Sequence, residues 1–489
     1  MDFIKINPAD NVAVALKSLS KGTTVCGTPL TENVPPGHKF ALCSIPKGDN
    51  VIKYGYPIGR AVADIHAGEW VHTHNTKTNL SDLLEYTYTP QRSSLPAQPP
   101  RSFRGFRRSN GKVGIRNEIW IIPTVGCVNS PAKAIAKAAE SYVHGSVDGV
   151  YAFPHPYGCS QLGGDHENTQ KALAGLVKHP NAGGVLVLGL GCENNNIEEF
   201  KKVLGEIDGS RVKYLSCQDV EDEIEVGLAL IKELCETAAN DTREDIDASE
   251  LIVGLKCGGS DGYSGITANP CVGVFSDALI AQGGTAILTE VPEMFGAEQL
   301  LMARCENEEL FSKTVSLIND FKRYFQSYGQ PVYENPSPGN KAGGISTLED
   351  KSLGCTQKSG CAPVCAVIGY GDPIEGRGLH LLSSPGNDLV ASTALAVSGA
   401  HIVLFTTGRG TPFGCPVPTV KISSNTALAE KKRSWIDFDA GVICETGDIG
   451  AAGEALYDYV LALASGEVRT KNEEKGYRDV AIFKNGVTL

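Results

Sequence analysis

Four cysteines each follow an apolar run of strand length and stand at the start of a polar turn. Cys127 follows WIIPTVG, Cys159 follows VYAFPHPYG, Cys192 follows VLVLGLG and Cys257 follows LIVGLK. Thiolates are strong ligands for transition metals, although cysteine is also one of the most buried residue types and often only packs. We expect two or three of these thiols, with Cys159, Cys192 and Cys257 foremost, to bind one metal ion.

Two histidines complete the expected set of metal ligands. His72 and His74 lie in GEWVHTHN with a spacing of two residues. On a strand this spacing places both imidazoles on the same face, so that two nitrogens can reach one ion. The alternative is a pair of exposed polar side chains that alternate with an inward Val71.

Two further histidines flank Cys159 in HPYGCSQLGGDH. Histidine is the side chain best placed to move a proton near neutral pH, and both His155 and His166 lie in a glycine-rich segment. Either is expected to serve as a catalytic base, with a role in orienting the loop as the alternative.

The segment after Cys257, GGSDGYSGITANP, contains a GxSxG pattern at Gly258, Ser260 and Gly262. In a serine hydrolase this turn passes directly into a helix. Here the glycines and Pro270 delay a helix until after Asn269. We therefore expect Ser260, Asp261 and Asn269 to bind substrate hydroxyls, and we keep a serine hydrolase built on Ser260 as the alternative function.

Several charged and polar residues lie in other glycine-rich loops. Lys358 and Arg409 are cations that can pair with a substrate carboxylate, and Asn387 and Asp388 in SPGND are expected to bind hydroxyls. Three cysteines also lie close together in the sequence and are an alternative site, for an iron–sulfur cluster; they are Cys355, Cys361 and Cys365.

The elements that position these residues alternate between strand and helix. Buried strands such as VLVLGLG alternate with helical segments such as residues 166–178 and 197–204, which is typical of parallel sheets. Ligands of such sheets bind outside the carboxyl ends of the strands. We therefore expect the four strand endings to form one shared rim and one active site.

The pattern divides the chain into three domains. Residues 1–90 contain short β-like pieces, and residues 11–20 have the spacing of a short helix. Residues 91–104 are rich in proline and are expected to be a linker. Two α/β domains follow, at residues 105–240 and 248–489. The irregular residues 329–353 are expected to form an ordered loop over the site.

The composition limits the classes of partner. The 489 residues include 44 Lys and Arg against 56 Asp and Glu, a net charge of −12, which argues against nucleic acid as a partner. The sequence lacks a secretory start and an 18-residue apolar run, so we expect a cytoplasmic protein without a membrane segment. The 15 cysteines are then expected to be free thiols. A homo-oligomer is compatible with these features.

At these loops the chain closely resembles the altronate/galactarate dehydratase family. The resemblance runs nearly end to end and includes VIKYGYPIG, VHTHNT, RNEIWIIPTVGCVN, YGCSQLGGDHENT, GLGCENN, CGGSDGYSGITANP, TEVPEMFGAEQLL, ENPSPGNKAGG, EDKSLGCTQK and TTGRGTP. It implies an N-terminal SAF-type β-clip domain, a requirement for Fe²⁺ and elimination of water from a sugar acid. The expected thiol and histidine ligands also suit Mn²⁺, which is the alternative metal. Cys361 and Cys365 lie outside the motifs of the family, which weakens the local cysteine cluster.

The implied reaction is a β-elimination. A bound ion would stabilise the enolate that forms when a base removes the proton on carbon 2, after which the 3-hydroxyl leaves. The resemblance favours D-altronate, converted to 2-dehydro-3-deoxy-D-gluconate in hexuronate catabolism, with galactarate or another aldarate as the alternative. A sugar-acid-binding protein without catalysis is the competing class.

Overall fold

The N-terminal domain is a small all-β unit. In the computed structural model, which describes residues 1–80, 83–91 and 94–488, its first sheet has the order β1-β2-β5-β8. A second sheet has the order β6-β7-β9, and β3 pairs with β4. The bounds are β1 Phe3–Ile4, β2 Val12–Ala15, β3 Thr24–Val25, β4 Thr28–Pro29, β5 Lys39–Ala41, β6 Asn50–Lys53, β7 Tyr56–Ala61, β8 Trp70–Val71 and β9 Thr76–Lys77.

The helix expected at residues 11–20 is wrong, because β2 occupies Val12–Ala15. All four of its residues are buried, so β2 carries apolar side chains on both faces. The period-2 signal of a half-exposed strand is therefore absent, and the spacing of Val12, Leu16 and Leu19 resembles that of a helix by coincidence.

The second domain is built on a four-stranded parallel sheet with the order β13-β12-β14-β15. A small antiparallel sheet, β11-β10-β16, adjoins it. The strands are β10 Ser102–Arg107, β11 Val113–Gly114, β12 Glu118–Pro123, β13 Gly149–Ala152, β14 Ala182–Gly189, β15 Val212–Ser216 and β16 Glu244–Asp247. The α-helices are α1 Asn129–Ala138, α2 Gly163–Val177, α3 Ile197–Leu204 and α4 Glu223–Ala238.

The C-terminal domain contains a seven-stranded parallel sheet with the order β19-β20-β18-β17-β21-β22-β23. Its strands are β17 Ile252–Cys257, β18 Thr285–Leu288, β19 Val364–Ile368, β20 Gly378–Leu382, β21 Ile402–Thr407, β22 Thr419–Ser423 and β23 Phe438–Asp439. Its α-helices are α5 Ala268–Ala281, α6 Glu298–Met302, α7 Glu308–Ser327, α8 Pro338–Ala342, α9 Leu348–Cys355, α10 Asp388–Val397, α11 Thr426–Lys431, α12 Ile443–Thr446, α13 Ile449–Ala464 and α14 Lys471–Glu474.

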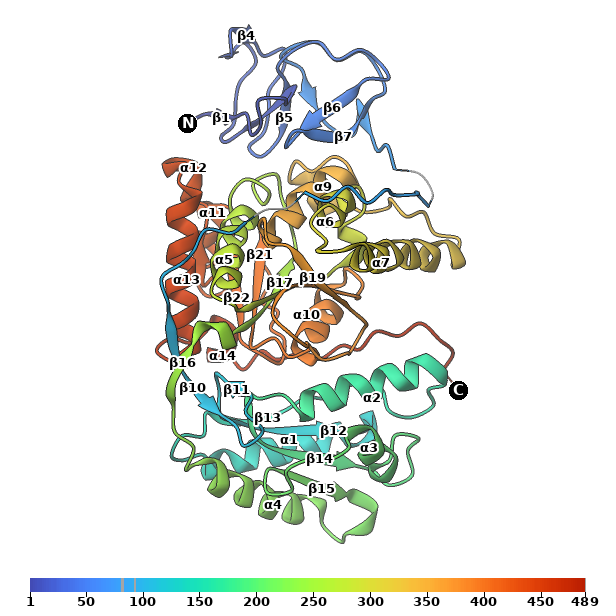
Figure 1. The fold of residues 1–489 in the computed structure, drawn as a ribbon, viewed down its shortest axis with the longest axis vertical. Coiled ribbons are helices and arrows are strands. Elements are labelled where there is room, and N and C mark those ends of the chain that lie inside the picture. The colour runs from blue at the N-terminus through green and yellow to red at the C-terminus, as the bar shows by residue number, and fades with distance from the viewer. Residues whose placement is uncertain (81–82, 92–93, 489) are drawn as a thin grey trace.

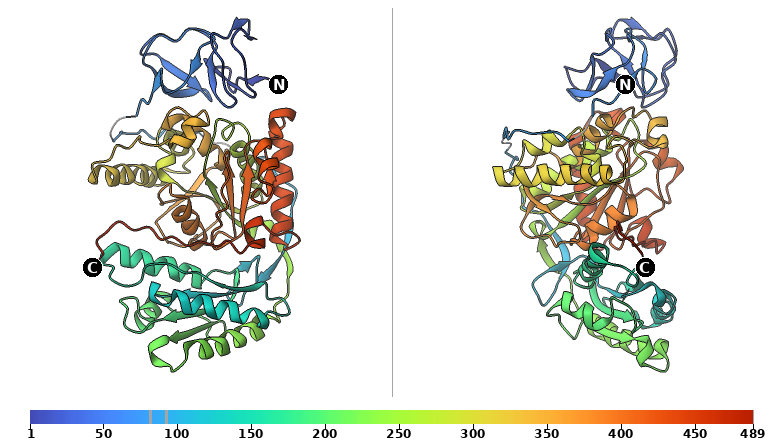
Figure 2. Two further views of the ribbon diagram at one scale, coloured as in Figure 1. Left: turned by 180° about the vertical axis from the view of Figure 1, so that it is seen from behind. Right: turned by 90° about the vertical axis from the view of Figure 1, so that its right-hand side faces the viewer.

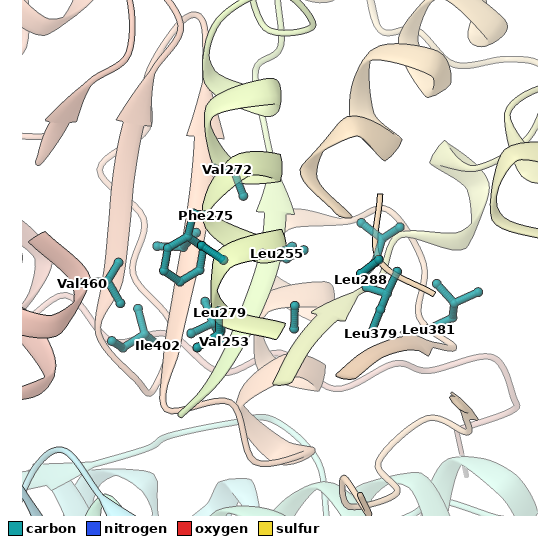
Figure 3. Packing of buried hydrophobic residues seen from close by; sticks show 14 of the residues in the cluster. Val253, Leu255, Val272, Phe275, Leu279, Leu288, Leu379, Leu381, Ile402 and Val460 are labelled. Atoms are coloured by element: carbon teal, nitrogen blue, oxygen red, sulfur yellow. The ribbon is translucent and has the colours of Figure 1, made fainter. Parts of the chain in front are cut away.

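The central strand β17 is buried on both faces. Val253 and Leu255 pack with Phe275 and Leu279 of α5 on one side of the sheet (Figure 3), and none of these four side chains is exposed. Such a strand consists almost entirely of apolar residues. Lys256 and Cys257 are therefore polar exceptions at its carboxyl end.

The C-terminal domain lies between the other two domains in space, although it comes last in the sequence (Figure 1). The chain leaves the N-terminal domain and passes over the C-terminal domain, where Tyr86, Tyr88 and Leu95 pack against its core. It then enters the second domain, which lies at the opposite end of the molecule (Figure 2). Among the described residues, no helix combines the length and the apolar character needed to cross a lipid bilayer.

Candidate metal centre and active site

The carboxyl end of β17 carries a buried cation. Lys256 Nζ donates to the Cys257 carbonyl oxygen at 2.5 Å and to Asp388 Oδ1 at 2.9 Å, and it forms an ion pair with Glu290. Neither Lys256 nor Glu290 is exposed by more than 1%. A buried charge requires partners of this kind, so Lys256 and Glu290 hold each other in place beneath the loop.

Two thiols and one carboxylate meet beside this ion pair. Cys257 Sγ lies 3.4 Å from Cys355 Sγ and 3.2 Å from Glu293 Oε2, and Cys355 Sγ lies 3.3 Å from the same carboxylate oxygen. All three residues are buried, and their ligand atoms lie within 4.8 Å of one another. Among the described residues, no other group of three or more His, Cys, Asp or Glu side chains converges in this way.

Three separate elements deliver these ligands. Cys257 ends β17, Glu293 lies in the single turn Val291–Glu293 after β18, and Cys355 ends α9. Glu290 begins that turn with a positive φ of 69°, a conformation that is uncommon for a residue other than glycine. The Cys257 N–H donates to Glu290 Oε2 at 3.0 Å, which ties the turn after β18 to the end of β17.

The thiols of Cys257 and Cys355 are within hydrogen-bond distance of each other. The hydrogen bond from Cys355 lowers the pKa of Cys257 to about 6, whereas the same interaction and burial raise the pKa of Cys355 well above its usual value. Cys257 is therefore the thiolate of the pair near neutral pH. A thiolate is the form of cysteine that binds metal.

Lysine side chains surround the group of Cys257, Glu293 and Cys355. Lys351 Nζ donates to Glu293 Oε1 at 2.7 Å, and Lys358 Nζ lies 3.8 Å from Glu290 Oε2. Burial alone would raise the pKa of Glu293, but Lys351, Lys256 and Lys358 outweigh it and lower that pKa to about 2. Glu293 is thus a carboxylate at neutral pH.

The donor set fits a borderline transition metal. Sulfur ligands suit zinc and iron better than magnesium or calcium, whereas a carboxylate oxygen suits Fe²⁺ and Mn²⁺. Two sulfurs and one carboxylate oxygen leave coordination positions for a substrate, which is the arrangement of a catalytic site. Cys257, Glu293 and Cys355 therefore fit a resident divalent ion.

A small cavity of about 10 Å³ adjoins Cys355. Its lining includes Ser260, Asn269 and Lys351 of the C-terminal domain and Lys53 and Tyr54 of the N-terminal domain. The hydroxyl of Ser260 is buried and has no hydrogen-bond partner. A buried hydroxyl without a partner is costly, so Ser260 has the capacity to bind a ligand in this cavity.

The cavity lies where the N-terminal domain meets the C-terminal domain. Asp350 of α9 accepts from Lys39 Nζ at 2.8 Å and from Lys53 Nζ at 3.0 Å, with all three side chains buried. Thr78 of the N-terminal domain also donates to Glu349 of α9. The N-terminal domain therefore closes over the site through contacts with α9.

His72 and His74 lie in a turn after β8 and not on a strand. Both rings contact Trp70, with ring centroids 5.4 Å and 5.3 Å away, and the His72 ring lies 5.0 Å from that of His38. Burial lowers the pKa of His72 to about 4, and its Nδ1 has no hydrogen-bond partner. The structure does not group either histidine with Cys257.

The expectation of one shared rim is wrong, because the strand endings belong to two different sheets. Cys257 ends a strand of the seven-stranded sheet, whereas Cys159 and Cys192 follow strands of the four-stranded sheet in the second domain. Both of these cysteines are exposed. Repeated strand endings predict a shared rim only if the strands share a sheet, and the sequence does not reveal where one sheet ends.

The second domain also holds the two expected catalytic histidines. His155 is buried, with Nε2 2.8 Å from the Pro123 carbonyl oxygen and Nδ1 accepting from the Tyr157 N–H at 3.2 Å. Both ring nitrogens thus bind backbone, which favours a structural role. His166 lies on α2, with a buried Nδ1 that lacks a partner. The structure brings neither histidine to the cavity beside Cys355.

Two of the residues expected to bind substrate form structural hydrogen bonds. Asp261 Oδ1 accepts from the hydroxyls of Ser264 and Ser424 at 3.0 Å and 2.8 Å. Asn269 donates to the Gly354 carbonyl oxygen and accepts from Thr406. Both residues are buried at the loop after β17 and hold its shape.

The remaining predicted residues differ in their distance from the buried group. Lys358 and Asp388 contact Glu290 and Lys256, respectively. Asn387 is exposed and caps α10, and Arg409 is exposed with a contact to the Gly339 carbonyl oxygen.

The three cysteines that lie close together in the sequence, Cys355, Cys361 and Cys365, differ in their burial. Cys355 is buried beside Cys257, whereas Cys361 is exposed and Cys365 donates to the Pro363 carbonyl oxygen and to Glu306. Nearness in sequence therefore does not predict a shared site for these three thiols.

Two acidic residues at the site were not predicted from the sequence, although they lie at the end of a strand. Glu290 and Glu293 follow the strand GTAILT in TEVPEM, so they satisfy the same rule of strand endings that identified Cys257. Lys256 and Lys351 had no comparable signal, because charged residues within or beside apolar runs are usually solvent-exposed.

The comparisons with known proteins cover the whole chain. Residues 1–79 match the family model "Altronate/galactarate dehydratase SAF domain", residues 105–239 match "D-galactarate dehydratase/Altronate hydrolase, second domain", and residues 248–488 match "D-galactarate/Altronate dehydratase, C-terminal". The three models follow one another in the order of the three structural units.

Full-length relatives agree with these models. The chain is 56% identical to the altronate dehydratase of Bacillus subtilis (strain 168) over 496 residues, which cover 100% of this chain and 99% of the relative. It is also 56% identical to the altronate dehydratase of Escherichia coli (strain K12), with 100% of both chains covered. Identity to the galactarate dehydratase (L-threo-forming) of Escherichia coli (strain K12) is 34%, with 98% and 96% covered.

Proposed function

The chain belongs to the D-galactarate/altronate dehydratase family and is a hydro-lyase, and we propose that it removes water from D-altronate to give 2-dehydro-3-deoxy-D-gluconate. The higher identity to altronate dehydratases than to galactarate dehydratase supports altronate as the substrate. The observation that carries the mechanism is the buried group of Cys257, Glu293 and Cys355 beside the cavity that contains Ser260.

Cys257, Glu293 and Cys355 are the residues that would hold the divalent ion, with Fe²⁺ as the proposed metal and Mn²⁺ as the alternative. When bound, such an ion supplies a Lewis acid that stabilises negative charge on oxygen atoms of the substrate. The Cys257 thiolate and the Glu293 carboxylate are already ionised near neutral pH. Binding therefore requires the loss of only the remaining proton of Cys355.

The lysines compensate negative charge at the site. Lys351 lines the cavity and is fixed by its 2.7 Å contact with Glu293. Glu293 and the neighbouring thiols raise the pKa of Lys351 although burial opposes this, so it remains an ammonium. We assign it to the substrate carboxylate, where its charge stabilises the enolate that forms as the proton on carbon 2 leaves.

We propose that His72 of the N-terminal domain removes that proton, although it does not line the cavity in this closed arrangement either. Its lowered pKa keeps the ring neutral at pH 7, and its Nδ1 lone pair has no partner. Its ring lies 5.0 Å from that of His38, the residue before Lys39, which pairs with Asp350 at the contact between the two domains. The sequence predicted His72 as a metal ligand; we now propose that it acts as the general base. His74 is its neighbour and contacts the same tryptophan.

Ser260 is proposed to bind a substrate hydroxyl and not to act as a nucleophile. A serine nucleophile requires a base within hydrogen-bond reach, but the buried Ser260 hydroxyl has no partner of any kind. In addition, α5 begins only at Ala268, eight residues later, whereas a nucleophile elbow leads directly into its helix. The geometry thus disfavours the serine hydrolase.

Substrate entry requires the N-terminal domain to move. A cavity of about 10 Å³ holds roughly one water molecule, far less than a six-carbon acid. Because the N-terminal domain supplies Lys53 and Tyr54 to the lining, separation of this domain from α9 would open the site. Its return would exclude water from the reacting groups.

The experiment that tests the proposed function is a keto-acid assay with anaerobically purified protein loaded with Fe²⁺. The panel contains D-altronate, galactarate, other aldonic and aldaric acids, and a simple ester as a hydrolase substrate. We expect keto-acid formation from altronate with the highest kcat/KM. Tight binding of altronate without a keto product would support a binding protein, and ester cleavage that chelators do not affect would support a hydrolase.

A further inference from the structure

The second domain has a cysteine after every strand of its parallel sheet. Cys127 follows β12, Cys159 follows β13, Cys192 follows β14 and Cys217 follows β15. The four strands are parallel, so their carboxyl ends lie along one edge. The function proposed above uses none of these thiols, because the second domain lies at the end of the molecule opposite to the N-terminal domain (Figure 1).

Backbone hydrogen bonds join the loops that carry these cysteines into one unit. The contacts link residues adjacent to each cysteine: Gly126 N to Tyr157 O at 2.9 Å, Asn195 N to Gly158 O at 3.0 Å and Gln218 N to Leu190 O at 3.0 Å. The loop of Cys127 is thereby tied to that of Cys159, the loop of Cys159 to that of Cys192, and the loop of Cys192 to that of Cys217.

The thiols of Cys159 and Cys192 lie at the junctions between these loops. Cys159 Sγ lies 3.5 Å from Asn194 Oδ1, in the loop of Cys192, and Gln218 Nε2 donates to Cys192 Sγ at 3.4 Å. The backbone at Cys159 is also fixed, since Ser160 has a positive φ of 58° and donates to Asn194 Oδ1 at 2.9 Å. Strained backbone of this kind persists where the surroundings enforce it.

Three of the four thiols are accessible to an external ligand. Cys127, Cys159 and Cys192 are exposed, and none forms a disulfide. Cys217 is partly buried, and burial together with Glu223 and Glu193 raises the pKa of its thiol to about 11. The accessible set is therefore Cys127, Cys159 and Cys192.

The spacing of these thiols disfavours a single ion. A zinc ion with Zn–S bonds of about 2.3 Å in a tetrahedron holds its sulfurs roughly 4 Å apart, but no three of these four cysteines, all within the described residues, have sulfurs within 4.8 Å of one another. A [4Fe–4S] cluster binds each thiolate to a different iron atom. Its ligands are consequently farther apart than those of one ion.

We propose that Cys127, Cys159 and Cys192 bind a [4Fe–4S] cluster at the carboxyl edge of the second domain's sheet. Binding is a ligand exchange with a preformed cluster: each thiol loses its proton to solvent, and each thiolate replaces one ligand on one iron. No electron is transferred in this step. The fourth iron keeps an external ligand, and Cys217 remains a thiol.

The test is transfer of a preformed thiolate-ligated [4Fe–4S] complex to the full-length protein under anaerobic conditions, followed by gel filtration. Iron, acid-labile sulfide and visible absorption are then measured for the wild type and for Cys159→Ser and Cys192→Ser. We expect about four sulfides per wild-type chain and less than a tenth of that in either variant. Cys217→Ser, on the same edge, and Cys43→Ser, an exposed cysteine of the N-terminal domain, are the matched controls and should retain the wild-type content.

Three results would overturn the proposal: no sulfide bound by the wild type, unchanged sulfide in both serine variants, or an equal loss in the Cys217→Ser and Cys43→Ser controls. Melting temperatures of all variants show whether a loss reflects unfolding. The outcome is separate from that of the proposed function, because Cys257→Ser should lose dehydratase activity and keep the full sulfide content.

Discussion

Lys39 of the N-terminal domain and Asp350 of the C-terminal domain form an ion pair of 2.8 Å in which both side chains are fully buried. Lys53 contacts the second carboxylate oxygen at 3.0 Å. One carboxylate thus neutralises two cations of another domain. Since an unpaired buried charge is strongly destabilising, Asp350 controls the docking of the N-terminal domain onto α9.

Asp350→Asn should therefore weaken domain docking by about 3–5 kcal/mol. The expected signs are a lower melting temperature and faster proteolysis between the N-terminal domain and residue 102. The double variant Lys39→Met/Asp350→Asn should recover part of the loss, because it removes one of the two cations. Equal proteolysis rates for Asp350→Asn and the wild type would show that the contact does not hold the domains together.

Ser260→Ala should reduce kcat/KM for altronate by about 10-fold, the effect of one lost hydrogen bond to the substrate. The melting temperature should not change, because the hydroxyl has no partner in the protein. Ser392→Ala is the matched control, since the Ser392 hydroxyl on α10 is also buried without a partner. If both variants retain full activity, Ser260 does not contact the substrate.

The proposed base gives a separate prediction. His72→Gln should reduce kcat by 100-fold or more, in the usual range for loss of general base catalysis, while the affinity for Fe²⁺ stays at the wild-type value. His74→Gln tests the neighbouring ring. A loss of bound iron in His72→Gln, measured by equilibrium dialysis, would instead support a role for His72 as metal ligand.

Two histidines at the junction of the second and C-terminal domains make stability depend on pH. Burial lowers the pKa of His179 to about 3 and that of His401 to about 4, from 6.5. The Nδ1 atoms of both rings accept backbone N–H groups, from Asn181 and Ile252 respectively, so protonation would break these bonds.

Between pH 6.5 and the lowered pKa values, the unfolded chain binds more protons at these two rings than the folded chain. The free energy of unfolding should therefore rise as the pH increases through this window and fall on acidification. Urea titrations at a series of pH values measure this slope. His401→Gln should reduce the slope, and an unchanged slope in that variant would exclude His401 as a cause.

The sequence predicted the helices and strands correctly where the pattern of apolar residues was compatible with only one type of secondary structure. The helix at Ile197–Leu204 and the strand that becomes β17 were predicted correctly, and the three-part α/β organisation with a small β domain is confirmed. The predicted helix at residues 11–20 failed because β2 is buried on both faces and lacks an alternating pattern. In residues 329–353, the short helix α8 and the start of α9 have too few turns for a periodic signal.

The site was only partly predictable from the sequence. The order of the strands in the sheet brings its residues together, and the sequence does not reveal that order. The strand ending predicts Cys257 as a ligand, but its partner Cys355 lies about 100 residues later at the end of a helix, and Glu293 in TEVPEM was not predicted. The unpaired Ser260 hydroxyl and the role of Lys351 depend on burial. Burial of a charged side chain is set by its partners in space, which sequence periodicity does not report.

We propose that Cys257, Glu293 and Cys355 bind the ion required for dehydration. The most direct measurement is Fe²⁺ titration of altronate dehydratase activity after anaerobic chelation, for the wild type, Glu293→Gln and Cys355→Ser. The control is Cys271→Ser, a buried cysteine of α5 outside the group. We predict that chelation abolishes activity, that Fe²⁺ restores it in the wild type and the control, and that both site variants need at least about 10-fold more metal. Full activity after complete chelation, or identical titrations for all four proteins, would contradict the account.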